Sequence, residues 1–184
     1  MKTVFNHQNG VEKIRTGQRI ASQLRRGGNF SESLQYAHLC LDLSKQINAQ
    51  ALVGESYNLI GLVYEETEKQ NLAQKYLNKA LDCFREAGYD SGEANALINL
   101  ALVMEDDYKK IEYTLAAIEP NAKTGDTTQL LLIYSNLSYH YFLVGEYGKS
   151  LDAVDQGLSI IYQSHDPSKH NKRKGQILVN MCEN

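Results

Sequence analysis

The stretch that decides the fold reads YNLIGLVY at residues 57–64, and it recurs as YSNLSYHY at residues 134–141. Both copies begin and end with tyrosine and carry an apolar residue followed by a small residue in the middle. The small residue recurs at Ala21, Gly61, Ala101 and Ser138, with spacings of 40, 40 and 37 residues. A fixed period of this length is typical of a solenoid of stacked helix pairs, which presents an extended surface for binding another macromolecule.

The composition favours a helical protein with a substantial core. The chain has 184 residues, of which 42% are hydrophobic and only two are proline, and this balance suits packed helices. The net charge of -3 gives no general attraction to nucleic acid or anionic membranes, so we expect neither as a partner. The chain lacks a signal-peptide core and an apolar run long enough to span a membrane, so the cytoplasm is the expected location.

The apolar periodicity predicts an all-α fold with four helix pairs and a partial fifth. We expect a flexible N-terminus at 1–10 and a single solenoid domain at 11–184, with pairs at about 11–47, 52–87, 92–119 and 127–163 and the partial helix at 175–184. Within these pairs, Ser31 is expected to cap the second helix. Gly88 and Pro120 are expected to end later helices.

These residues resemble the tetratricopeptide repeat family, whose repeats carry an aromatic residue, Leu-Gly and Tyr on the first helix and alanines on the second. The best copy reads Tyr57, Ile60, Gly61, Tyr64, Ala73, Leu77 and Ala80. The copy at 134–154 is similar, whereas Gly17 and Met104 stand where the first and third copies should carry aromatic residues. The resemblance covers about 11–162 and implies a right-handed superhelix that binds proteins or peptides. The period of about 40 is similar to that of long-repeat bacterial regulatory and sensory proteins.

In such a superhelix the first helix of each pair lines the concave face. Residues one turn away from the core stripe should therefore point into a groove that suits a peptide or a helix. The predicted groove residues are Arg15, Gln18, Ser22, Arg25, Asn58, Leu62, Glu65, Ile98, Leu102, Glu105, Ser135, Tyr139 and Phe142. This groove would be basic at one end, acidic in the middle and apolar at the other.

Some members of the family hold a partner's terminal carboxylate in a clamp of basic and amide side chains. The matching places here read Gln18, Ser22, Leu59, Asn95 and Asn99. Because most of the basic members are missing, the resemblance does not imply binding of chaperone tails.

No catalytic constellation, metal-ligand spacing or cofactor motif is visible in the sequence. The three cysteines are widely separated, which disfavours a disulfide framework or a zinc site. His140 is expected to be a packing or surface histidine, and the basic run at 169–174 a solvated loop. We therefore expect no enzyme activity, metal or cofactor within this chain.

The sequence predicts a protein- or peptide-binding scaffold, as the sensory or regulatory region of a bacterial signalling protein. The alternative is a free-standing adaptor or secretion-type chaperone. The last apolar stripe, Ile177 to Cys182, begins a helix without a second helix to cover it. Since solenoids need a cap over the terminal apolar face, we expect either a continuing chain or a homodimer through that face.

Overall fold

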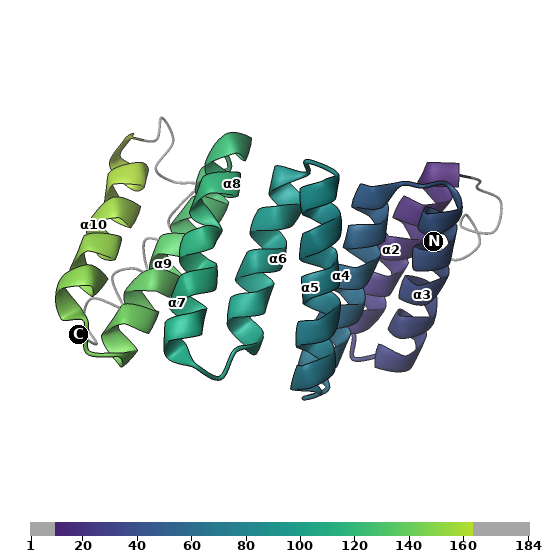
Figure 1. The fold of residues 1–184 in the computed structure, drawn as a ribbon, viewed down its shortest axis with the longest axis horizontal. Coiled ribbons are helices and arrows are strands. Elements are labelled where there is room, and N and C mark those ends of the chain that lie inside the picture. The colour runs from purple at the N-terminus through teal and green to yellow at the C-terminus, as the bar shows by residue number, and fades with distance from the viewer. Residues whose placement is uncertain (1–9, 164–184) are drawn as a thin grey trace. The chain divides into compact units, whose positions relative to one another are not determined.

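The computed structural model describes residues 10–163, and over this range α-helices are joined by short turns (Figure 1). The chain divides into two compact units, of which unit 1 ends at Val103 and unit 2 begins at Met104. The expected all-α fold is confirmed for these described residues. The partial fifth helix, the basic run at 169–174 and the N-terminus except Gly10 lie outside them. The single domain expected at 11–184 stays a prediction.

In the described part of unit 1, residues 10–103, five helices begin 20 residues apart. They are α2 (Gly10–Arg26), α3 (Phe30–Gln46), α4 (Gln50–Glu66), α5 (Gln70–Glu86) and α6 (Asp90–Val103). Two helices therefore make one 40-residue repeat, as the spacing of the small residues predicts. Each of the first four helices has 17 residues, or nearly five turns.

Neighbouring helices of unit 1 pack against one another in chain order, α2 on α3, α3 on α4, α4 on α5 and α5 on α6. One core cluster joins Ala21, Ala37, Leu41, Val53, Ile60 and Cys83. Gly61 lies where α4 meets α5, because a Cβ placed on it would be 2.7 Å from Cγ of Leu77. The small residue at this position therefore allows the two helices of the repeat to approach closely.

The same contact between paired helices recurs along the chain. In the first repeat, Oγ of Ser33 donates a hydrogen bond of 2.8 Å to the carbonyl of Ala21. In unit 2, Oγ of Ser150 donates a bond of the same length to the carbonyl of Ser138. Both serines are buried. At both positions a serine of the second helix therefore bonds to the backbone of the small residue of the first helix.

The turns of unit 1 share one backbone conformation. Gly28, Asn48, Glu68 and Gly88 occupy equivalent positions 20 residues apart and have φ of 76°, 53°, 57° and 60°. In each turn this residue donates its N–H to the carbonyl three residues earlier, and the next residue donates to the carbonyl five residues earlier. This left-handed turn satisfies the last carbonyls of the helix and reverses the chain. Gly88 ends α5 as predicted.

Unit 2 contains α7 (Asp107–Ala116), α8 (Ile118–Thr124), α9 (Thr127–Leu143) and α10 (Tyr147–Gln163). Two of its helices begin with an aspartate cap, since Asp106 accepts a hydrogen bond from N of Lys109 and Asp126 from N of Gln129, each of 3.0 Å. α9 packs against α10, α7 and α8. Leu131, Val154 and Ile161 form a core cluster there.

Two expected boundaries are wrong. Asn29, not Ser31, is the N-cap of α3, because the left-handed turn at Gly28 starts the helix at Phe30. Pro120 does not end a helix but lies in the first turn of α8, after α7 has ended at Ala116. Proline is tolerated there because the first N–H groups of a helix have no intrahelical acceptor.

Candidate functional site

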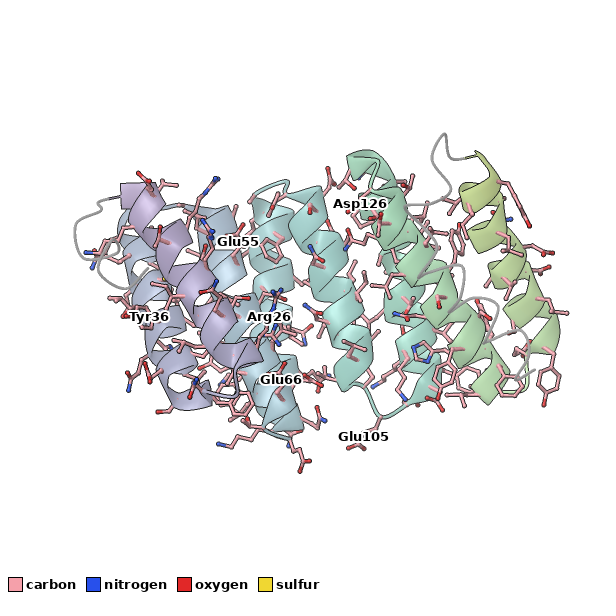
Figure 2. The ribbon with its side chains drawn as sticks, turned by 180° about the vertical axis from the view of Figure 1, so that it is seen from behind. Arg26, Tyr36, Glu55, Glu66, Glu105 and Asp126 are labelled. Carbon is pink, nitrogen blue, oxygen red and sulfur yellow. The ribbon has the colours of Figure 1, made fainter. Side chains whose placement is uncertain are left out.

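Unit 1 contains a hollow of about 660 Å³ on the side where the first helices of the repeats lie. Figure 2 shows unit 1 from this side, with Glu55 labelled. The lining comes from α2, α4 and α6, together with the end of α5 and the turn that follows it. It consists of Arg15, Gln18, Arg19, Ser22, Glu55, Asn58, Leu59, Leu62, Phe84, Tyr89, Gly92, Asn95 and Asn99.

The three helices contribute side chains from the same repeat positions. Positions one repeat apart give the sets Arg15, Glu55 and Asn95; Gln18 and Asn58; Arg19, Leu59 and Asn99; and Ser22 and Leu62. The chemistry changes from helix to helix, because α2 supplies arginines, α4 supplies apolar residues and one carboxylate, and α6 supplies amides. The repeat therefore builds a surface that is regular in geometry and graded in chemistry.

Side-chain amides, one buried and two half-buried, join these three helices. Nε2 of Gln18 donates to the carbonyl of Leu52 at 2.9 Å and to Oγ of Ser56 at 3.0 Å, and so links α2 to α4. Nδ2 of Asn99 donates to Oδ1 of Asn58 at 2.9 Å and so links α6 to α4. Gln18 is only 7% exposed and lines the hollow, and its Nε2 already has two acceptors.

The charged groups of the lining are two arginines and one glutamate. Arg15 and Arg19 are exposed, and neither forms an ion pair with another residue in the range 10–163. Glu55 is half-buried, and burial raises its pKa above the usual 4.5, while the positive charge of Arg15 partly opposes that shift. The hollow therefore carries a small excess of positive charge.

Phe84 and Tyr89 form the apolar end of the hollow. Their ring centroids are 5.6 Å apart with the rings edge to face, and Phe84 is buried while Tyr89 is 38% exposed. A Cβ would lie 2.6 Å from Cε1 of Phe84 at Gly54 and 2.5 Å from its Cδ1 at Gly92. Only glycine leaves room for the Phe84 ring between α4 and α6.

A sequence model of the tetratricopeptide repeat family matches residues 14–86. These residues belong to that family. The match covers α3, α4 and α5 in full and α2 from Ile14 onward. It therefore includes the residues of α2 and α4 that line the hollow, and also the Tyr-x-x-Ile-Gly-x-x-Tyr pattern of α4. Tetratricopeptide repeats are protein-interaction modules, so this region is an interaction scaffold.

The fold is also similar to a solved structure, BtubC (BKLC) from P. vanneervenii. The TM-score is 0.72 at 18% sequence identity, over 86% of this chain and 68% of that chain. This likeness concerns the fold alone. A search among characterised proteins returns no significant sequence match. Over residues 10–163, every helix is too short or too polar to cross a lipid bilayer.

Five of the predicted groove residues line the hollow of the tetratricopeptide region, namely Arg15, Gln18, Ser22, Asn58 and Leu62. Arg25 and Glu65 lie outside the lining, and Arg25 is ion-paired with Glu66. The five places compared with a carboxylate clamp, Gln18, Ser22, Leu59, Asn95 and Asn99, all line the hollow. These five positions therefore lie on one face, which is the face of the hollow.

The remaining predicted groove residues differ in exposure. Ile98 and Ser135 are buried, with 7% and 3% of their surface exposed, and neither lines the hollow. Leu102 and Tyr139 are 57% and 45% exposed, Glu105 is exposed in a turn, and Phe142 is half-buried against the Tyr147 ring. Within unit 2, Tyr139 and Phe142 stay predicted contact residues.

Sequence reasoning missed several lining residues, chiefly Arg19, Glu55, Tyr89 and Gly92. The signal for Glu55 was present, because adding one 40-residue period to Arg15 gives its position. Tyr89 lies in a turn and Gly92 lies just after it, at the start of α6, where helical periodicity carries no information.

The two cysteines among the described residues are not activated, and these residues form no metal cluster. Burial raises the pKa of the Cys40 thiol to about 12 and also raises that of Cys83, so both thiols stay protonated at neutral pH. In the range 10–163, no group of three or more His, Cys, Asp or Glu side chains is placed to hold a metal ion. His140 is half-buried in unit 2, where burial and nearby Lys110 lower its pKa.

Proposed function

We propose that this chain is a non-catalytic scaffold that binds a peptide segment of a partner protein across α2, α4 and α6. The observation that carries this proposal is the lining of the hollow by equivalent positions of three successive repeats. Its volume of about 660 Å³ lies in the range that ligand sites occupy, and it combines apolar walls with a few converging polar groups.

The chemistry of the lining supports a peptide as the ligand. The hydrogen bond between Asn58 and Asn99 leaves Nδ2 of Asn58 and Oδ1 of Asn99 for a further partner. One donor and one acceptor are the kinds of group that pair with the C=O and N–H groups of an extended backbone. Leu62 and Tyr89 offer apolar surface for the side chains of such a segment.

We further propose that the scaffold serves a signalling or regulatory protein in the bacterial cytoplasm. Support comes from the 40-residue repeat, which is similar in length to those of the regulatory proteins that the sequence resembles, and from two buried free cysteines, which suit a reducing compartment. The full gene sequence would test the regulatory role. An effector region in the same reading frame supports it, and a gene that encodes these repeats alone contradicts it.

A site-specific cross-linker tests the binding site itself. A photo-reactive amino acid at Leu62 lies inside the hollow, whereas the same residue at exposed Lys75 on α5 lies outside its lining. After irradiation in the native host, we expect a defined adduct from position 62 and none from position 75. Equal cross-linking from both positions, or adducts from position 75 alone, would place the interaction elsewhere.

A further inference from the structure

We propose that the peptide bound in the hollow carries an aspartate or glutamate, and that Arg15 and Arg19 bind its carboxylate. The inference rests on the proposed function of the hollow and names the chemistry of its ligand. It is carried by the position, exposure and pairing of these two arginines.

Arg15 and Arg19 are four residues apart on α2, so their side chains lie on the same face of the helix, about one turn from each other. Both are exposed and both line the hollow. Arg25, further along the same helix, is instead ion-paired with Glu66 of α4. The fold thus neutralises Arg25, which lies outside the hollow, and leaves Arg15 and Arg19 without an ion-pair partner among residues 10–163.

Glu55, the only carboxylate that the described residues supply to the lining, does not neutralise them. Glu55 occupies the position one repeat after Arg15 and feels its charge, but the two groups do not form an ion pair. Two arginines against one glutamate leave a charge of +1 in the lining, whereas the whole chain carries -3. A carboxylate of the ligand would balance this local excess, and arginine binds carboxylates through two parallel N–H groups.

The arrangement also sets the direction of the ligand. The arginines belong to α2, whereas the amides Asn95 and Asn99 belong to α6, with α4 between them. With helix axes about 8–10 Å apart, the three helices span about 16–20 Å, which five or six extended residues cover. The acidic residue should therefore lie toward the end of a short segment, at α2, with its backbone bound at α6.

Nucleic acid fits this surface less well. A phosphate backbone needs several lysines or arginines in a row, and the hollow offers two beside a glutamate. The amides and apolar groups on its other side suit a peptide better than a second phosphate.

A displayed library of random heptapeptides tests the inference on the full chain. With the wild-type protein, we expect selected peptides to share an aspartate or glutamate at one position. The double variant Arg15→Glu/Arg19→Glu should lose these peptides and select lysine or arginine there instead. The matched control Arg26→Glu/Lys75→Glu makes the same charge change at two exposed positions outside the lining and should select the same acidic peptides as the wild type.

Affinity for one selected peptide then assigns the contact. Replacing its acidic residue with the corresponding amide should weaken binding to the wild type by about tenfold or more. The same replacement should leave binding to Arg15→Glu/Arg19→Glu unchanged or improved, and circular dichroism should show that this variant is folded.

Each result of the selection is decisive. Enriched peptides without a shared acidic residue would overturn the inference and leave the peptide-binding function standing. Failure of the wild type to enrich any peptide would overturn the proposed function. Acidic peptides that bind the arginine variant as well as the wild type would also overturn the role of Arg15 and Arg19.

Discussion

Gly61 shows how one residue controls the packing of a repeat. Alanine at this position would place its Cβ 2.7 Å from Cγ and 2.8 Å from Cδ2 of Leu77, which is fully buried. The helices must then separate or Leu77 must leave its rotamer, so we expect Gly61→Ala to lower the free energy of unfolding by about 1–3 kcal/mol. Urea unfolding followed by circular dichroism measures the change.

Gly27→Ala is the matched control for this prediction. An added Cβ at Gly27 meets its nearest atoms at 3.5 Å, which is ordinary contact, and Gly27 does not have positive φ. We expect little change in stability for that variant. Equal stability of Gly61→Ala and the wild type would mean that α4 and α5 are not packed as closely as described.

Glu55 gives a pH-dependent prediction at the residue scale. Burial raises the pKa of Glu55 in the folded protein, so the fold favours its protonated form. Protonation of Glu55 therefore contributes to the free energy of unfolding below the unfolded-state pKa, and this contribution is lost as pH rises through the folded-state pKa. We therefore expect Glu55→Gln to be more stable than the wild type at pH 7, with the difference vanishing near pH 4.

Thermal unfolding of both proteins across this pH range measures the effect. Asp42→Asn, which changes an exposed carboxylate on α3, serves as the control and should not reproduce the trend. A Glu55→Gln variant that is less stable at pH 7 would show that the attraction of Arg15 outweighs the cost of burial.

How far individual residues could be predicted from the sequence depends on periodicity. Tyr57, Ile60 and Gly61 were placed correctly because spacing along a helix fixes which face a residue occupies. Ile98 lies at the same repeat position as Gln18 and Asn58, which line the hollow, yet it is buried and outside the lining, because spacing fixes the face of a helix and not how deeply neighbouring side chains cover it. Residues at one repeat position can therefore differ in exposure, and the sequence pattern does not show this difference.

At the scale of elements, the left-handed turns explain why α2, α3, α4 and α5 have one length. Four turns place a residue with positive φ at the same point, and glycine occupies two of these positions. Glu68 is the costliest occupant, since a residue with a Cβ is disfavoured there by about 1–2 kcal/mol. We expect Glu68→Gly to raise the free energy of unfolding by about 1 kcal/mol.

The reverse change at an equivalent turn supplies the control. Gly88→Ala introduces a Cβ at φ of 60°, where nothing within 4 Å would clash with it, so strain alone should lower stability. Chemical denaturation of both variants measures the two shifts. Shifts of the same sign would contradict a shared turn conformation.

The errors at element boundaries have the same physical origin. Ser31 has the chemistry of a good cap, but the backbone reversal at Gly28 had already set where α3 begins. Pro120 was read as a stop, although its ring is compatible with the first turn of a new helix. Composition identifies residues that favour the ends of helices, but it does not show whether such a residue ends one helix or begins the next.

At the scale of the whole molecule, the hollow belongs entirely to unit 1. All of its lining residues lie between Arg15 and Asn99, and unit 1 ends at Val103. We therefore expect a protein that ends at Val103 to bind a selected acidic peptide with the same Kd as the full chain. Fluorescence polarisation with one labelled peptide measures both values.

A second truncation makes this prediction specific. A protein that ends at Glu86 retains the residues that match the tetratricopeptide family, 14–86, but loses α6 and with it Gly92, Asn95 and Asn99. We expect this shorter protein to bind far more weakly while circular dichroism still reports helices, because the amide side of the hollow is gone. If the protein ending at Val103 is helical and yet loses affinity, residues beyond Val103 contribute to binding. If the protein ending at Glu86 binds as well as the full chain, the site does not need α6, and the assignment of the ligand backbone to its asparagines fails.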